Sequence, residues 1–306
     1  MLSTEPFEIP QSLLEKSKGL ARAPMAVAGA NNLVALESAR QAADAGLIDP
    51  ILVGDADAIY AIACEMDWDV AKYRIEHAAD ERDAAVRAVA IARAGEAQAL
   101  MKGHVHTDAL MAAVVNRDQG LRTGRRLSHI FHMTVPKSDR VLMITDGAVN
   151  VAPNESAMVD IVNNAVALSH ALGITEPRVA MLSGTESPIP SMPSSQLAAA
   201  VVQRANNGEV TGALVDGPFA FDNAISPDAA KLKGIGSPVA GNADILAVPN
   251  IETGNGLFKM MVYFKSALAA GVVMGAKVPI VLTSRADPPE ARFAAAAIAA
   301  ITASKT

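Results

Sequence analysis

Short apolar runs alternate with longer helical patterns through almost the whole sequence, and this alternation constrains the fold most. The run at 24–28 leads into a helical pattern, the run at 98–102 does the same, and the run at 278–283 precedes a last helical pattern at 288–300. Strands that alternate with helices form parallel sheets covered by helices. With 51% hydrophobic but only 4% aromatic residues, the sequence favours alanine-rich helices that lie close to such a sheet. We therefore predict an α/β protein.

The chain is long enough for two domains, at 306 residues. The alternation of strand and helix patterns becomes less regular near Gly120. The last strand–helix pair resembles the regular alternation of the first part of the sequence. We predict a discontinuous first domain, residues 1–125 with 275–306, and an inserted second domain, residues 126–274. Within the second domain we expect a long helix over about 254–271.

Composition excludes several classes of protein. A net charge of −6 argues against a general nucleic-acid binder. No stretch approaches the roughly 20 apolar residues that span a membrane, and no signal peptide pattern is present, so we expect a soluble, cytoplasmic protein without a membrane partner. Cys64 is the single cysteine, which fits a reducing compartment, and its helical neighbours suggest an inert, buried side chain.

Polar loops follow several predicted strands, where ligands bind in parallel sheets. Ser284 and Arg285 stand between a strand and a helix, and arginine can hold phosphate in a bidentate fork. The glycine-rich loop around Lys233 carries cations and backbone amides that can bind anions. The segment 250–255 leads into a helix whose N-terminus suits phosphate, although capping by Thr253 or Asn255 explains the same residues.

The segment 102–107 also follows a predicted strand, and Thr107 or Asp108 could cap the next helix. His104 and His106 could suggest a metal site, but no acidic or cysteine partner with ligand spacing stands nearby, so we predict none. The sequence also lacks a phosphate-binding P-loop, an HExxH motif and a dinucleotide fingerprint.

Six motifs in order carry a family resemblance: MKGHVHT from Met101, GLRTGRRLSHI from Gly120, VLMITDGAVNVAPN from Val141, VDGPFAFDNAIS from Val215, KGIGSPVAGNADILAVPNIETGN from Lys233 and VPIVLTSRAD from Val278. Together they resemble the phosphate acetyl/butyryltransferase family, more closely its butyryltransferase branch. The resemblance covers nearly all of the chain from about Pro24 onward.

The resemblance implies reversible transfer of a short acyl group between coenzyme A and phosphate, with coenzyme A as a substrate and no bound cofactor or metal. It also implies a homodimer or higher homo-oligomer. The implied fold is the two-domain α/β/α type of the isocitrate and isopropylmalate dehydrogenases, with the active site in the interdomain cleft. Direct transfer in a ternary complex follows, because no cysteine suits an acyl-enzyme.

The family pattern places its Ser-Arg pair at Ser284 and Arg285. The usual catalytic aspartate would fall on Ala291, so Asp287 and Glu290 are the candidate bases. The candidate substrate-binding residues lie in the matched motifs: Lys102, Gly103, His104, Thr107, Lys233, Ser237, Pro238, Asn242, Glu252, Gly254 and Asn255.

Two alternatives stay open. One is a metal-dependent decarboxylating dehydrogenase of the same fold, which needs an aspartate cluster that the sequence does not offer. The other is a non-catalytic protein that binds coenzyme A or acyl phosphate. Neither alternative predicts phosphate-dependent release of coenzyme A.

Overall fold

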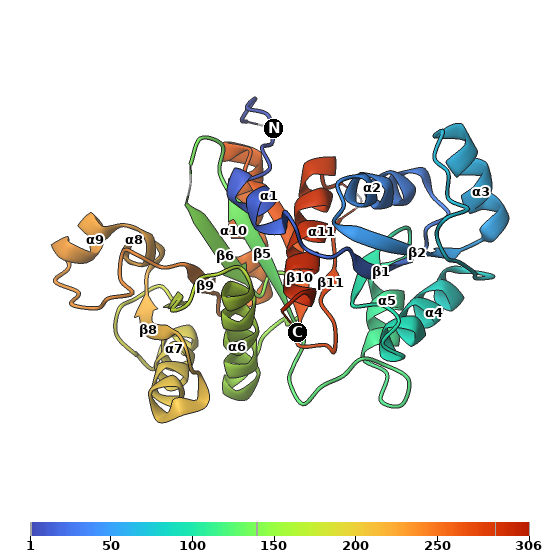
Figure 1. Ribbon diagram of the computed structural model, residues 1–306. Helices are drawn as coiled ribbons and strands as arrows, with labels where there is room; N and C mark the ends of the chain where they lie inside the picture. Colours follow the sequence, from blue (N-terminus) through green and yellow to red (C-terminus); the bar gives the residue numbers. More distant parts are fainter. Residues whose placement is uncertain (1, 139, 285, 306) are drawn as a thin grey trace. The chain divides into compact units, whose positions relative to one another are not determined.

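The computed structural model describes residues 2–138, 140–284 and 286–305. Its chain divides into two compact units. One consists of Ile9–Arg125 with Ala270–Thr306, and the other of Met1–Glu8 with Arg126–Ala269. Each unit contains strands and helices (Figure 1), so the prediction of a mixed α/β fold is confirmed.

Among its described residues, the unit with residues 9–125 has six strands, in the order β3-β2-β1-β4-β11-β10. Their bounds are β1 Ala23–Ala28, β2 Ile48–Gly54, β3 Ile75–His77, β4 Ala99–Lys102, β10 Leu268–Met274 and β11 Ile280–Val281. All neighbours are parallel except β10, which runs antiparallel to β11. β11 therefore lies between β4 and β10, although it comes from the last part of the sequence.

Helices cover this sheet on both faces. They are α1 Gln11–Ser17, α2 Leu33–Asp44, α3 Ala56–Glu65, α4 Glu81–Arg93, α5 Thr107–Val114 and α11 Pro289–Ala303. Figure 1 shows α2 on one face and α4 with α5 on the other. The buried faces of α2 and α11 consist largely of alanine, which lets these two helices approach the strands and each other.

The other unit contains the strands β5 Ser128–Thr134, β6 Val141–Thr145, β7 Arg178–Leu182, β8 Leu214–Phe219 and β9 Ile245–Ala247. Their order is β5-β6-β9-β7-β8, with β5 antiparallel to β6 and the other pairs parallel. Its helices are α6 Glu155–Ala171, α7 Pro193–Arg204, the π-helix η1 Ala205–Glu209, α8 Phe221–Ile225, α9 Pro227–Leu232 and α10 Ile251–Lys265.

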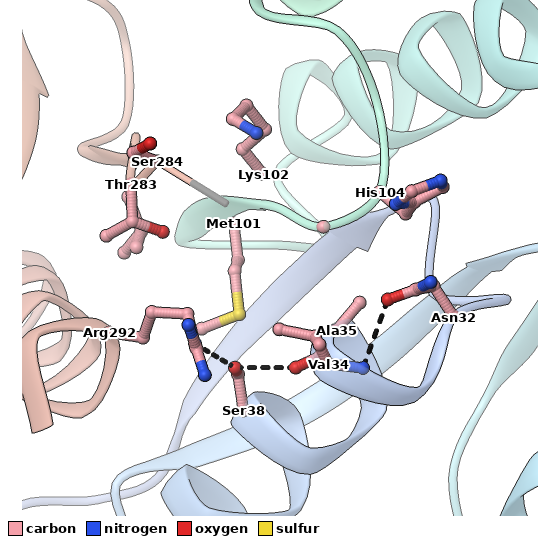
Figure 2. Close-up of a pocket in the computed structure, with 12 residues that line it drawn as sticks. Asn32, Val34, Ala35, Ser38, Met101, Lys102, His104, Thr283, Ser284 and Arg292 are labelled. Carbon is pink, nitrogen blue, oxygen red and sulfur yellow. Dashed lines mark hydrogen bonds between the residues drawn. The ribbon is translucent and has the colours of Figure 1, made fainter. Parts of the chain in front are cut away.

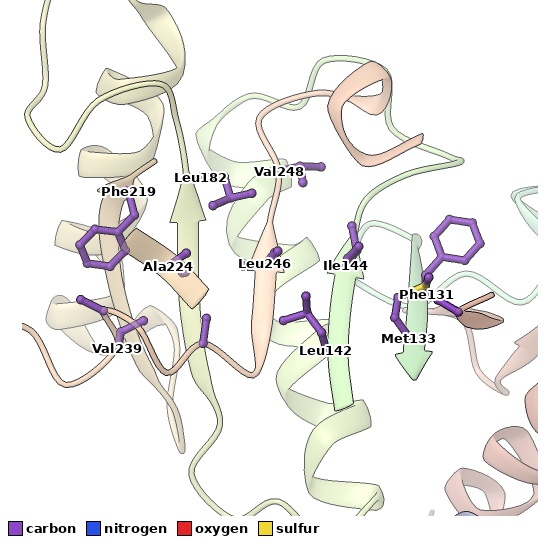
Figure 3. Packing of buried hydrophobic residues seen from close by; sticks show 14 of the residues in the cluster. Phe131, Met133, Leu142, Ile144, Leu182, Phe219, Ala224, Val239, Leu246 and Val248 are labelled. Carbon is purple, nitrogen blue, oxygen red and sulfur yellow. The ribbon is translucent and has the colours of Figure 1, made fainter. Parts of the chain in front are cut away.

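In this second unit, β6 buries one face against α10 and the other against α6. Leu142 and Ile144 belong to a hydrophobic cluster (Figure 3) against which Phe258 of α10 packs. Met143, between them, contacts Ser169 of α6 instead. This alternation is the period of two that a strand imposes on its side chains.

Two expectations are wrong. The helix expected over 254–271 ends at Lys265, because Ser266 adopts a left-handed φ of 48° and the buried run from Leu268 forms strand β10. Cys64 is exposed rather than buried. It lies on the outer side of α3, whereas Ile59 and Ala63 lie on the side of the helix that faces inward.

Candidate functional site

A turn at the carboxyl end of β4 presents Lys102, Gly103 and His104. The Gly103 N–H donates to the Ala28 carbonyl at 2.9 Å, and the His104 N–H donates to Gly29 at 2.8 Å. A Cβ atom on Gly103 would lie 2.6 Å from the Gly29 oxygen and 2.7 Å from that of Ala28. Because both neighbours are backbone, only glycine fits this turn.

Ser284 stands just beyond β11, in a loop that closes on itself. Its N–H donates to Asp287 Oδ2 at 2.6 Å, and its Oγ accepts from the Ala286 N–H at 3.3 Å. The Asp287 carboxylate thus fixes the backbone of Ser284. Arg285, the other half of the predicted pair, lies outside the described residues.

Asp287 is half-buried, and its ionisation is perturbed. Burial raises the pKa of its carboxyl, while the Ser284 N–H and the positive charges of Arg292 and Lys102 oppose that rise without cancelling it. A carboxylate with a raised pKa is a stronger base than one in water. Glu290 lies in the first turn of α11, and its side chain is partly exposed.

Ser284 and the β4 turn line a pocket of about 170 Å³ (Figure 2). Four sequence elements line it: the start of α2, the β4 turn, the end of β11 and the first turn of α11. Of the predicted site residues, the structure brings Lys102, Gly103, His104 and Ser284 together here. The remaining lining residues are Asn32, Val34, Ala35, Ser38, Met101, Val281, Thr283 and Arg292.

Arg292 is the lining residue whose absence from the prediction matters most. Its Nε donates to Ser38 Oγ at 2.9 Å, and its Nη1 donates to the Asp287 carbonyl. Arg292 therefore ties the Ser284 loop to α2. The available signal was an arginine in the first turn of an otherwise alanine-rich helix, which the prediction did not use.

Lys102 is buried, and its Nζ donates to the Val105 carbonyl at 3.3 Å, which holds a positive charge beside the β4 turn. Thr107 is exposed and is the first residue of α5, outside the pocket lining. The expectation that Thr107 or Asp108 caps this helix is wrong: the N-cap is His106, and it makes no side-chain capping bond.

One cation of the predicted anion loop in the second unit, Lys233, is in an ion pair. Lys233 Nζ lies 2.6 Å from Glu186 Oε1 and 3.9 Å from Asp222 Oδ2. The hydrogen bond with Glu186 raises the pKa of Lys233 and lowers that of Glu186. The positive charge of Lys233 is thus already balanced by these carboxylates in this conformation.

Two other polar residues of this loop form hydrogen bonds with nearby backbone groups of the loop itself. Ser237 Oγ accepts from the Val239 N–H at 3.2 Å, and Asn242 Nδ2 donates to the Ala240 carbonyl at 3.1 Å. Pro238 lines a different hollow of about 290 Å³ beside β8.

The start of α10 packs against the turn that follows β6. Asn250, rather than Thr253 or Asn255, caps the helix by accepting the Thr253 N–H at 2.9 Å. Asn255 Nδ2 donates to the Gly147 carbonyl at 3.3 Å, while Glu252 is exposed. A Cβ atom on Gly254 would lie 2.7 Å from the Asp146 carbonyl oxygen.

The Asp146 side chain organises that turn. Its Oδ1 accepts from the N–H groups of Ala148 and Val149, and its Oδ2 accepts from those of His129 and Asn150. These bonds use the carboxylate for structure. Sequence reasoning matched this motif but gave Asp146 no role.

Comparison with known proteins decides the family. The family model described as phosphate acetyl/butaryl transferase matches residues 72–300. The chain belongs to this family.

Two relatives illustrate the family's acyl groups. The chain is 46% identical over 293 residues to a phosphate acetyltransferase of Rhizobium meliloti, covering 96% of this chain and 93% of the relative. It is 40% identical over 291 residues to a phosphate butyryltransferase of Clostridium acetobutylicum, covering 95% and 97%.

Solved structures agree on the fold. A branched-chain phosphotransacylase from Enterococcus faecalis V583 superposes with a TM-score of 0.78 at 30% identity, covering 92% of this chain and 99% of that one. A 4-hydroxythreonine-4-phosphate dehydrogenase from Burkholderia phymatum gives a TM-score of 0.54 at 14% identity, covering 92% and 98%. That second likeness concerns the fold alone.

Among residues 2–138, 140–284 and 286–305, no three His, Cys, Asp or Glu side chains gather closely enough to hold a metal ion. Within the same ranges no helix is both long and apolar enough to cross a membrane.

Proposed function

We propose that this phosphate acyltransferase moves a short acyl group directly between coenzyme A and phosphate in a ternary complex. The observation that carries the proposal is the Ser284 loop, which Asp287 fixes at the edge of a pocket that also contains Lys102 and His104. Holding both substrates in place supplies much of the rate in such a reaction.

In the direction from acyl phosphate to acyl-CoA, the reaction forms one bond, breaks another and transfers one proton. The thiolate sulfur forms a bond to the acyl carbon, the bond from that carbon to the phosphate oxygen breaks, and the thiol proton goes to a base. The carbonyl oxygen gains negative charge on the way, so a fixed hydrogen-bond donor lowers the barrier.

We assign these roles to the residues of the Ser284 loop. Ser284 donates its O–H to the carbonyl oxygen, and Asp287 takes the thiol proton, for which its raised pKa suits it. Arg285 holds the departing phosphate in a bidentate fork. Glu290, in the first turn of the next helix, is the alternative base.

The second unit supplies the remaining predicted substrate contacts, at Lys233, Ser237, Pro238, Asn242, Glu252, Gly254 and Asn255. In this proposal Lys233 must leave Glu186 to reach an anion, since the two are paired at 2.6 Å. Thr107 at the start of α5 also stays a predicted contact. The two-domain arrangement with its active site in an interdomain cleft stays a prediction from the resemblance, as do the domain boundaries and the cytoplasmic location.

We also propose a homodimer that forms through α10. Met260, Tyr263 and Phe264, which we call the α10 surface, are 49%, 52% and 57% exposed. Their spacing places them on one stripe of the helix, and a cluster of exposed large apolar side chains is typical of an interface.

The deciding test is an assay of coenzyme A release from acetyl-, propionyl- and butyryl-CoA with and without phosphate. We expect release that depends on phosphate and is unchanged by a chelator. A strict magnesium requirement, or oxidation of a 2-hydroxy acid with NAD, would instead favour the dehydrogenase alternative. Binding of coenzyme A without any release would favour a non-catalytic protein.

A further inference from the structure

The pocket beside Ser284 has polar side chains at two ends and, with Asn32 and His104, along one side, and apolar side chains between the two ends. Ser284 and Lys102 lie at one end, and the hydrogen-bonded pair of Ser38 and Arg292 lies at the other (Figure 2). Between the ends, Met101 extends its sulfur toward Ser38 and Arg292, with Ala35 beside it.

We propose that this pocket holds the hydrocarbon part of an acyl group of about four carbons while its carbonyl lies at Ser284. The inference rests on the proposed transferase function and names the substrate class of the same site. Acetyl groups are then accepted but leave most of the pocket unfilled.

The volume of the pocket supports a chain longer than acetyl. An aliphatic cavity of about 150 Å³ is enough to hold a benzene molecule. At about 170 Å³ this pocket has room for the three carbons beyond a butyryl carbonyl. A single methyl group would contact only part of the apolar wall, and each further buried methylene adds binding free energy.

The same features argue against the pantetheine arm of coenzyme A as the occupant. That arm carries two amides, and buried amides need hydrogen-bond partners. Between the two ends lie Val34, Ala35 and Met101, whose side chains can provide none. The Ser38–Arg292 pair also stands at the far end, where a longer arm would need to continue.

Ala35 is the residue that leaves space for the chain. It lies in the first turn of α2 and is buried, with 6% exposure. Its Cβ is already close to the β4 turn, because a Cβ atom built on Gly103 would lie 3.1 Å from it. Because Ala35 lines the pocket, a larger side chain at position 35 would take up space that the acyl chain needs.

The test compares Ala35→Val with Ala42→Val, a buried alanine of the same helix that does not line the pocket. We expect Ala35→Val to lower the ratio of kcat/KM for butyryl-CoA to that for acetyl-CoA by on the order of tenfold. Ala42→Val should leave the ratio unchanged. Should Ala35→Val not fold, Val34→Phe serves instead, because Val34 is 41% exposed at the pocket and tolerates a larger side chain.

Direct binding separates this inference from the proposed function. Calorimetry without phosphate should give a tighter Kd for butyryl-CoA than for acetyl-CoA, and Ala35→Val should remove the difference. If wild type binds both but releases no coenzyme A, the transferase proposal fails while the Kd ratio still decides the pocket. Equal weakening of both acyl-CoAs in Ala35→Val would identify the pantetheine arm as the occupant and overturn the inference, as would an unchanged ratio.

Discussion

Asp287 combines two properties that a catalytic base needs, a fixed position and a raised pKa. Its Oδ2 is held at 2.6 Å from the Ser284 nitrogen, and burial disfavours its charged form. The loop therefore positions a hydroxyl donor and a proton acceptor within four residues of chain.

Replacing Asp287 by asparagine removes the charge but keeps an oxygen that can accept the Ser284 N–H. We expect kcat to fall roughly a hundredfold or more, the usual contribution of general base catalysis. The acidic limb of the pH–rate profile should disappear as well, because in wild type activity is lost as the pH falls through the raised pKa of Asp287. Glu290→Gln is the comparison: if it abolishes that limb and Asp287→Asn does not, Glu290 is the base.

The same variant should be more stable than wild type at neutral pH. Between the unfolded pKa of an aspartate, about 3.9, and its raised folded pKa, the folded state binds more protons than the unfolded state. The free energy of unfolding therefore falls as the pH rises through this window and stays lower above it. Denaturant unfolding should show Asp287→Asn gaining stability at neutral pH and not at a pH below both values. An equal gain at both pH values would contradict this account.

The prediction for Arg285 depends on its planar guanidinium group binding phosphate through two hydrogen bonds. Arg285→Ala should lose activity by roughly a hundredfold or more, since about 1.4 kcal/mol is already tenfold in rate. Arg285→Lys should recover little of it, because a point charge cannot replace a planar fork. Steady-state kinetics with varied phosphate checks both, and near-normal turnover in either variant would remove Arg285 from the site.

Residue by residue, the sequence revealed the loops but not their neighbours in space. Lys102 and His104 are candidates because they lie in a motif of the family resemblance, and Ser284 is one because it also follows a strand. Arg292 and Ser38 meet only because α11 packs beside α2, and no spacing within the sequence records that the two helices are adjacent. The motifs could therefore be predicted from the sequence, but the complete lining of the pocket could not, because it depends on long-range packing.

At the scale of elements, α10 offers a matched pair of glycines. Gly254→Ala should destabilise the protein by roughly 1–3 kcal/mol, because its new methyl group would meet the backbone of Asp146 and Gly147. Gly256 has open space around it, so Gly256→Ala should be neutral or stabilising, as alanine favours helices. Chemical denaturation measures both, and equal effects would show that the contact with the β6 turn does not matter.

The boundary between α10 and β10 could not be predicted from the sequence pattern. Both elements are apolar, and together they look like one long helix. The break depends on Ser266, whose left-handed φ of 48° ends the helix, and on strand β11, which pairs with β10. A serine gives little local sign of that conformation, so the strand could not be separated from the helix by sequence alone.

At the scale of the whole molecule, the α10 surface predicts how the protein assembles. Phe264→Glu should shift the protein from dimer to monomer in sedimentation, because the interface would have to bury a charge. Tyr60→Glu is the control, since Tyr60 is an aromatic residue of α3 with a similar exposure of 50%. A dimer that survives Phe264→Glu, or a wild-type monomer, would place the interface elsewhere or exclude it.

The position of β11 has a consequence for how the protein is made. This strand fills the gap between β4 and β10, yet it follows all the other described strands in the sequence, and Ser284 and Arg292 come after it. A ribosome that has translated only as far as β9 has produced the β4 turn and α2, but neither the strand nor the helix that completes the pocket. Nascent chains arrested at that length should have no transferase activity, so the site forms only after β11 and α11 have been synthesised.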